Sequence, residues 1–521
     1  MKNFNFIFVL LMLSISIFAQ TTPPTIQWQK SLGGTDVDYA YSIQQTNDGE
    51  FIIAGSTYSN DGDVSGQKGG IDYWVVKLDS TGNIQWQKCL GGTGIDKAYS
   101  IQQTNDWGYI VAGSSGSNNG DVTGNHGFDD YWVVKLDSIG NIQWQKSLGG
   151  IHSEGANSIR QTNDGGYIVA GYTCSNDGDV SGNHGGFEDY WVVKLDSSGN
   201  IQWQKCYGGM NGDAASSIAQ TADGGYIVGG SSDSNDSYVT GNHGGNDIWI
   251  IKINSAGSIK WEKCLGGSGQ DFLYSLQLTN DNGYILVGFS KSIDGDVTGN
   301  HGYEDYWVVK LDSSGNIQWQ KSLGGTNADY GYSIQQTNDG GYIVAGSSFS
   351  NDGDVTGHHG LTNYYDYWIV KLDSSGNIQW QKSLGGSQDD RGFSIQQTND
   401  GGFIATGQSK SNDGDVTGHH GTTSYDDIWI VKLSPPSLSI NEQIIASNIL
   451  IYPNPSNSNF TIKVTPKTRY VQISNSLGQV IEERTVTNQT ELQFEIKNNG
   501  IYFVQITTDK EIITKKVMIN N

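Results

Sequence analysis

Two series of tryptophans, each with seven members, constrain the fold of this chain more than any other feature. Successive members of a series lie 58 to 61 residues apart, and together they take all but one of the 15 tryptophans. Because the largest apolar side chains recur at one interval, we interpret the chain as seven similar units that pack on one another. The two series are Trp28, Trp86, Trp144, Trp203, Trp261, Trp319 and Trp380, and Trp74, Trp132, Trp191, Trp249, Trp307, Trp368 and Trp429.

Each unit contains two predicted β-hairpins. Residues 305–325, DYWVVKLDSSGNIQWQKSLGG, form two runs of alternating hydrophobicity around a DSSGN turn. Residues 332–348, YSIQQTNDGGYIVAGSS, place a tight NDGG turn between two more short runs. Helical periodicity does not occur between the runs, which argues against a parallel sheet with crossover helices. Four antiparallel strands per unit predict an all-β, seven-bladed β-propeller.

The ends of the array predict how the ring closes. Residues 25–34, TIQWQKSLGG, are an outer strand without the rest of a blade, and the last unit stops after its third strand at 426–433. The two fragments together complete one blade, so we expect a non-covalent closure that leaves no sheet edge free. An open solenoid would instead need atypical capping repeats, which the sequence does not show.

The remaining segments divide the chain into further parts. Residues 1–19 have one lysine, a short apolar run and a terminal alanine, which predicts a signal peptide rather than a membrane-spanning helix of about 20 residues. We expect the propeller at 25–433, a linker with a double proline at 434–447, and a second domain at 448–521. This organisation predicts a secreted protein that does not span the membrane.

The charge belongs to the propeller. The whole chain carries a net charge of -24, whereas the stretch from Ser437 onward has eight basic and seven acidic residues, so about -25 falls on the rest. An acidic surface repels phosphate backbones, which excludes nucleic acid as a partner and makes divalent cations reasonable ones. Solubility at high salt is an alternative reason for the charge. The four cysteines replace serines of other units and indicate no disulfide framework.

The loop DGDVTGNHG recurs in most units and is the candidate site for a cation. Closely spaced aspartates around glycine suit calcium, which would be the one possible cofactor. Asp-Gly turns also satisfy their own backbone, and the loop lacks the twelve-residue spacing and terminal glutamate of an EF-hand. We therefore favour structural turn chemistry and keep calcium as the alternative. The aspartates are Asp61, Asp63, Asp177, Asp179, Asp294, Asp296, Asp352, Asp354, Asp413 and Asp415.

A histidine follows the aspartates in most units. Equivalent atoms in different blades should lie too far apart to share one zinc ion, so we expect each imidazole to form hydrogen bonds inside its own loop. These residues are His126, His184, His243, His301, His359 and His420, with Lys68 at the corresponding position of the first unit.

The long connections should share one face of the propeller, and we expect that face to bind the ligand. The sequence contains no recognised catalytic motif, and every pair of acidic residues belongs to the repeat. We therefore predict a binding protein for a carbohydrate or protein ligand. The alternative is an exported hydrolase, such as a glycoside hydrolase, with an acidic site on the same face. Tyr364, Tyr365 and Tyr425 lie in two expanded loops where a ligand groove could form.

Two resemblances add to these expectations. The segment LDSSGNIQWQKSLGG resembles the tryptophan-docking repeat of quinoprotein-type propellers, which implies the fold but carries no quinone-binding residues. Residues 448–521 resemble the type A C-terminal sorting domain of the type IX secretion system of Bacteroidetes. The matching segments are NILIYPNPSNSNFTIKV, VQISNSLGQVI, NGIYFVQI and TKKVMI.

The second resemblance implies a small Ig-like β-sandwich that addresses the folded propeller to the secretion translocon and its sortase. The sorting domain is commonly removed afterwards, and the cargo is released or attached to the cell surface. The residues that match the motifs are Tyr452, Pro453, Asn454, Pro455, Gly478, Gly500, Tyr502, Lys515 and Lys516.

Overall fold

The computed structural model describes residues 23–185, 187–360, 363–435, 450–464, 468–476, 478–487, 489–508 and 512–520. The chain divides into two compact units, one that contains the seven repeats and one that contains the C-terminal strands. The predicted signal peptide and the linker between the units lie outside the described residues, apart from residues 434 and 435.

Twenty-eight strands form seven sheets of four. Blade 1 contains β2 (Asp38–Gln45), β3 (Phe51–Thr57), β4 (Asp72–Leu78) and β5 (Ile84–Leu90). Blade 2 contains β6 (Asp96–Gln103), β7 (Tyr109–Ser115), β8 (Asp130–Leu136) and β9 (Ile142–Leu148). Blade 3 contains β10 (Glu154–Gln161), β11 (Tyr167–Thr173), β12 (Asp189–Leu195) and β13 (Ile201–Tyr207). Blade 4 contains β14 (Asp213–Gln220), β15 (Tyr226–Ser232), β16 (Asp247–Ile253) and β17 (Ile259–Leu265).

The remaining three blades follow the same order. Blade 5 contains β18 (Asp271–Leu278), β19 (Tyr284–Ser290), β20 (Asp305–Leu311) and β21 (Ile317–Leu323). Blade 6 contains β22 (Asp329–Gln336), β23 (Tyr342–Ser348), β24 (Asp366–Leu372) and β25 (Ile378–Leu384). Blade 7 contains β26 (Asp390–Gln397), β27 (Phe403–Ser409), β28 (Asp427–Leu433) and, from the other end of the array, β1 (Ile26–Leu32).

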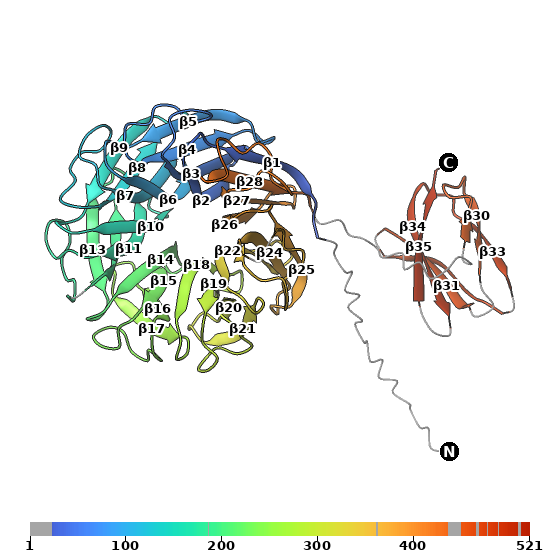
Figure 1. Cartoon of the computed structure of the whole chain (residues 1–521). Coiled ribbons are helices and arrows are strands. Elements are labelled where there is room, and N and C mark those ends of the chain that lie inside the picture. Colours follow the sequence, from blue (N-terminus) through green and yellow to red (C-terminus); the bar gives the residue numbers. More distant parts are fainter. Residues whose placement is uncertain are drawn as a thin grey trace, which may run out of the picture. The chain divides into compact units, whose positions relative to one another are not determined.

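The blades are arranged in a ring around a central axis, as Figure 1 shows, with the first strand of each blade innermost. The third strands, such as β4 with the sequence DYWVVKL, are buried at every position because neighbouring blades cover both faces. The outer strands, such as β5, are half-exposed and alternate in burial. The sequence-based expectation of a seven-bladed propeller is confirmed.

The tryptophan series that begins at Trp74 joins each blade to its neighbour. Trp132 is fully buried, and the Tyr73 ring of the preceding blade packs on it with ring centroids 4.6 Å apart. Such aromatic contacts contribute about 0.5–1.5 kcal/mol beyond the burial of their surface. Four more boundaries repeat the pair, and at the other two Ile248 and Ile428 stand in place of the tyrosine.

In the series that begins at Trp28, every member except Trp380 packs on the turn between the third and fourth strands of the next blade. The Trp28 ring lies against Gly82, where an added β-carbon would come within 2.9 Å of the ring. Gly82 also has a φ of +84°, a left-handed conformation that glycine adopts without strain. Glycine is therefore required in this turn for two reasons, the left-handed backbone conformation and the close approach of the indole.

The ring closes through β1, as expected from the two incomplete ends of the array. β1 pairs antiparallel with β28, and Ser31 lies opposite Trp429 as Cys89 lies opposite Trp74 in blade 1. The indole nitrogen of Trp429 donates to the Gln29 side-chain oxygen at 2.9 Å, which repeats the bond from Trp74 to Gln87. The closing blade thus has the register and polar contacts of an ordinary blade.

The C-terminal unit consists of two antiparallel sheets. One contains β29 (Leu450–Tyr452), β30 (Asn459–Lys463) and β33 (Glu491–Glu495). The other contains β31 (Thr468–Asn475), β32 (Val480–Thr485), β34 (Gly500–Thr508) and β35 (Ile512–Ile519). Alternate residues of both sheets, among them Phe460, Phe494, Val504 and Val517, form one buried core, which gives the expected small β-sandwich.

Candidate functional site on the long-loop face

The connections of each blade separate into two kinds. The turns between the first and second strands and between the third and fourth strands are short and lie at one end of the blade. The loops between the second and third strands, such as 58–71, and the blade-to-blade loops, such as 91–95, lie at the other end. This second surface is called the long-loop face below.

The first aspartate of each DGD loop caps a neighbouring turn. Asp61 accepts hydrogen bonds from the Thr35 backbone nitrogen at 2.7 Å and from the Thr35 hydroxyl at 2.8 Å. Asp294 and Asp352 hold Ser268 and Thr326 in the same way, and these bonds keep the pKa of all three carboxyls below the ordinary value. Asn119 replaces this aspartate in blade 2, and its side-chain oxygen accepts a hydrogen bond from the Thr93 backbone nitrogen at 2.8 Å. The contact therefore does not need a charge.

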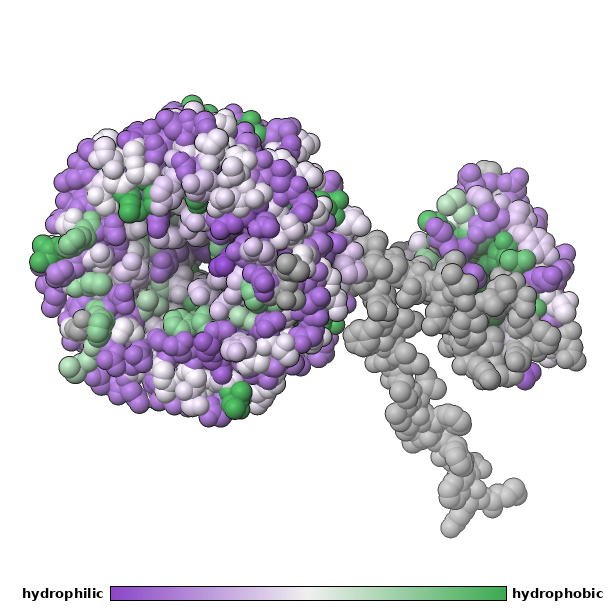
Figure 2. Space-filling view, viewed as in Figure 1, coloured by the Kyte–Doolittle hydropathy of each residue, from purple (hydrophilic) through white to green (hydrophobic). Residues whose placement is uncertain are grey.

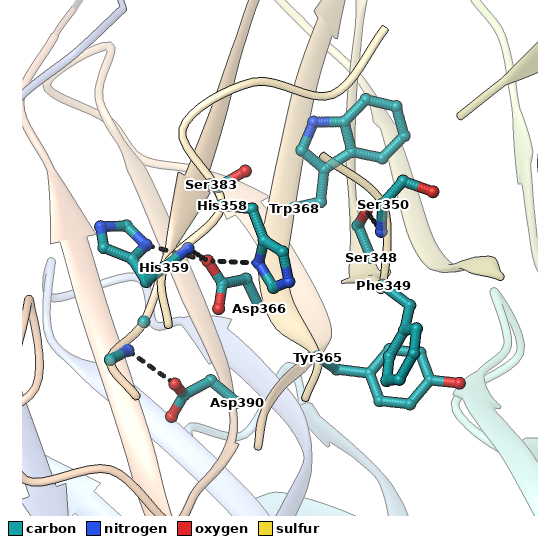
Figure 3. Close-up of polar contacts among 12 residues, drawn as sticks. Ser348, Phe349, Ser350, His358, His359, Tyr365, Asp366, Trp368, Ser383 and Asp390 are labelled. Atoms are coloured by element: carbon teal, nitrogen blue, oxygen red, sulfur yellow. Dashed lines mark hydrogen bonds and ion pairs between the residues drawn. The ribbon is translucent and has the colours of Figure 1, made fainter. Parts of the chain in front are cut away.

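The histidines form the expected hydrogen bonds within their own blades. His359 Nδ1 lies 2.8 Å from Asp366 Oδ2, and this contact raises the pKa of His359. Figure 3 shows His358 and His359 approaching the same Asp366 carboxylate from two sides, with His358 Nδ1 at 3.1 Å. The His358 side chain is buried and stands where blades 2 to 5 have an asparagine.

The other ring nitrogen extends toward the next blade, a contact that the sequence did not predict. His420 Nε2 lies 3.5 Å from Asp63, and His359 Nε2 lies 3.6 Å from Asp415. The second aspartate of one DGD loop thus faces the histidine of the preceding blade. The irregular repeats follow the same arrangement. Lys68 forms an ion pair with Asp121 at 2.5 Å, and His184 packs edge-on against Tyr238.

The predicted calcium ligands are therefore distributed among separate contacts. Asp61 and Asp63 of one loop bind different partners, and the same holds for Asp352 and Asp354. Within the described residues, no group of three or more histidine, cysteine, aspartate or glutamate side chains is placed to hold a metal ion. Calcium binding remains a prediction, which a measurement of stability with and without calcium can test.

The inner strands contain an asymmetry that the sequence reasoning missed. At the fourth position of these strands, five blades have an aromatic residue, whereas blades 3 and 4 have Asn157 and Ser216. At the second position the same two blades have Gly155 and Ala214. Aligning the seven inner strands would have revealed this pattern. Six of the fourth-position residues line one cavity of about 250 Å³: Tyr41, Asn157, Ser216, Tyr274, Tyr332 and Phe393.

The surface around the channel is mainly hydrophilic. Figure 2 shows the channel opening and hydrophobic side chains gathered mostly over blades 2 to 4. The tyrosines that we predicted near a groove differ in their surroundings. Tyr365 packs on Phe349 with centroids 4.7 Å apart and lies under the Arg391 guanidinium at 4.3 Å, whereas Tyr425 is exposed. The Tyr365 ring centroid also lies 6.0 Å from that of Tyr330, so the expanded loop of blade 6 packs on the inner strand β22.

The sorting-motif residues connect the two ends of the C-terminal unit. The Asn454 side chain donates to the Lys516 carbonyl at 2.8 Å and accepts from the Met518 nitrogen at 2.9 Å. Tyr502 is buried, and its hydroxyl donates to the Asn498 carbonyl at 2.9 Å. Gly478, with φ +78°, forms the turn between β31 and β32. Lys516 is exposed and Lys515 is half-buried on β35.

These contacts agree with the family to which this part of the chain is similar. Residues 450–520 match the secretion system C-terminal sorting domain family. The protein is therefore a β-propeller joined to a sorting domain, and this domain directs it through type IX secretion to the outside of the cell and the cell surface. The described part of the chain contains no helix that is long and apolar enough to cross a membrane.

Comparisons with individual proteins give more distant similarities. A stretch of 147 residues is 29% identical to regulatory protein FlaEY of Caulobacter vibrioides, covering 27% of this chain and 15% of that protein. PorZ, a surface component of the type IX secretion system of Porphyromonas gingivalis, is 11% identical with a TM-score of 0.42, over 94% of this chain and 60% of PorZ. The WD40 domain of Neurospora crassa Pan2 is 10% identical with a TM-score of 0.41, over 78% of this chain and 98% of that domain.

Proposed function

We propose that this protein is a non-catalytic receptor, exported to the cell surface, that binds its ligand on the long-loop face of the propeller. One observation favours binding over hydrolysis. The carboxyl groups whose pKa is raised most, such as Asp38 and Asp390, are fully buried, whereas the accessible loop carboxyl of Asp61 has a lowered pKa.

A glycoside hydrolase needs the opposite distribution. Its general acid is a carboxyl group with a raised pKa that contacts the glycosidic oxygen, paired with a second carboxylate across the bond. Asp38 has 0% exposure and is held by the Gly34 nitrogen and the Ser59 hydroxyl, so a substrate does not reach it. Asp61 is accessible, but its bonds to Thr35 favour the ionised form. The geometry therefore supports a surface for binding.

The binding test uses the purified mature protein on a carbohydrate array and a panel of surface proteins, next to a panel of hydrolase substrates. We expect binding without turnover, and we expect substitutions on the long-loop face to weaken it. Turnover that a single substitution abolishes would contradict the proposal. Binding that survives every substitution on this face but is lost on the short-turn face would contradict it as well.

The export test removes the sorting domain. A chain that ends after Ser437 keeps all 28 propeller strands, and we expect it to fold but to remain in the periplasm. Immunoblots of periplasmic, surface and medium fractions measure this outcome, with the full chain as the control. A normal extracellular yield of the truncated protein would contradict the role assigned to residues 450–520.

A further inference from the structure

We propose that the cavity at the long-loop end of the channel is a carbohydrate site, in which an aromatic arc stacks on one sugar ring and Asn157 and Ser216 hydrogen-bond to its hydroxyls. This inference rests on the proposed function and assigns its ligand class. Six blades contribute one residue each to this site, and these residues differ although the propeller is built from seven similar repeats.

The aromatic arc consists of Tyr274, Tyr332, Phe393, Tyr41 and Tyr99, and it is continuous over five blades. Neighbouring ring centroids are separated by 4.7 Å for Tyr274 and Tyr332, 5.1 Å for Tyr332 and Phe393, and 5.6 Å for Phe393 and Tyr41. Tyr99 of blade 2 extends the series, with its centroid 5.2 Å from that of Tyr41. The rings support one another, which fixes their orientation before a ligand binds and reduces the entropy lost on binding.

The opposite wall is small and polar. In blades 3 and 4, Asn157 and Ser216 occupy the strand position that the aromatic residues of the arc have in the other blades. Gly155 and Ala214 lie two residues earlier on the same strands, closer to the long-loop face. The Asn157 amide nitrogen donates to the Ala215 carbonyl at 2.8 Å. A side-chain amide has a second N–H and an acceptor oxygen besides this bond, and a serine hydroxyl both donates and accepts. The gap in the aromatic series is therefore also its hydrogen-bonding side.

The combination of these walls favours a carbohydrate over other ligands. A sugar ring has an apolar C–H face that packs on an aromatic ring and hydroxyl groups that need hydrogen-bond partners. The cavity of about 250 Å³ is smaller than the ~300–1,000 Å³ typical of sites for drug-sized molecules, so it suits one ring rather than a long chain.

An organic cation is the ligand that the arc alone would suggest, because aromatic cages bind quaternary ammonium groups. The opposite wall argues against it. Asn157 and Ser216 are neutral and offer hydrogen-bond donors and acceptors. A quaternary ammonium group has neither an N–H to donate nor a lone pair to accept, so it would leave both side chains without a partner on the ligand, whereas sugar hydroxyls supply one.

The test measures affinity for the neutral saccharide that binds best on the array, by titration calorimetry with the mature protein and its variants. Tyr332→Ala removes the centre of the arc, and Ser216→Tyr fills the gap with the residue that other blades have. We expect each to weaken binding at least tenfold. The matched control, Trp107→Gly, removes an aromatic residue from the short-turn face and should leave the affinity unchanged.

The outcomes separate this inference from the proposed function. Saccharide binding that both variants retain would overturn the site while leaving the receptor function in place. Binding of tetramethylammonium in place of any saccharide, lost in Tyr332→Ala, would overturn the ligand class. Turnover of the saccharide would overturn the receptor function itself. Ser216→Tyr removes no packing contact of the arc, so its effect remains interpretable if Tyr332→Ala does not fold.

Discussion

The Tyr73 hydroxyl of blade 1 donates a hydrogen bond to the Trp132 backbone carbonyl of blade 2 at 2.9 Å, while its ring packs on the Trp132 indole. One side chain thus makes a polar and an apolar contact across the same boundary. Both partners are fully buried. The boundary is therefore sensitive to a change as small as one oxygen atom.

Tyr73→Phe should destabilise the propeller by about 0.5–1.5 kcal/mol, because the ring contact stays while the buried Trp132 carbonyl loses the hydrogen bond from the tyrosine hydroxyl. Thermal unfolding of the mature protein measures the change. Tyr303→Phe is the matched control, since Tyr303 is 67% exposed. Equal melting temperatures for the two variants would show that the hydroxyl contributes nothing.

Deletion of residues 25–34 should destabilise the ring far more than trimming a terminus normally does. The deletion exposes the edge of β28 and removes Ile26, Trp28 and Leu32 from the core, which costs several kcal/mol at about 1.5–3 kcal/mol per fully buried large side chain. We expect a melting temperature lower by at least about 5 °C, or aggregation. A control that lacks only residues 20–24 should melt as the intact protein does. Identical melting of all three proteins would exclude closure by β1.

Trp107→Gly should stabilise the propeller by about 1 kcal/mol. Trp107 has φ +68° in a turn where most other blades have glycine, and its side chain is 55% exposed, so little packing is lost. The reverse change, Gly165→Trp at the equivalent position of blade 3, should cost a similar amount, because Gly165 has φ +81° and open space around it. Chemical denaturation measures both. Loss of stability in Trp107→Gly would show that the indole packs favourably in solution.

The propeller should become less stable as the pH rises from 4 to 8. Burial raises the pKa of Asp38 to about 6 and of Asp390 to about 7, against 3.8 in the unfolded chain. The folded state therefore binds these protons more tightly, so their contribution is complete below pH 4 and is lost as the pH passes the folded values. Melting temperatures at pH 5 and pH 8 measure the slope, which Asp390→Asn should reduce. Asp312→Asn is the control, because its pKa is lowered and it stays ionised throughout this range.

Calcium should have little effect on stability, with a change in melting temperature below about 1 °C between excess calcium and EGTA. Asp61 and Asp63 already accept hydrogen bonds from separate partners, and Asn119 replaces the first aspartate in blade 2 without loss of the turn contact. Asp61→Asn should likewise be tolerated. A rise of several degrees with calcium that Asp61→Asn abolishes would establish a cation site in this loop.

The fold was predictable from the sequence because the signals repeat. The turn of Gly82 and the spacing of Trp28 and Trp86 each occur six times, and the two incomplete ends complement each other. The contacts between blades were less predictable. That His420 reaches Asp63 depends on the angle between blades, and this angle is set by buried packing rather than by any local pattern. Asn157 and Ser216 escaped notice because a polar residue in one strand means little until the strands are placed around one axis.

The pairing of β1 with β28 also orders events during biosynthesis. The ribosome makes the outer strand of the closing blade at the start of the propeller and the third strand only near residue 433, so the ring is complete only when the whole propeller has been synthesised. The sorting domain follows directly, at residues 450–520. A chain that ends before residue 450 lacks the sorting domain, and a chain that ends before β28 also lacks a closed ring. The arrangement acts as a built-in quality control, in which every incomplete ring made by premature termination is left without a route to the cell surface.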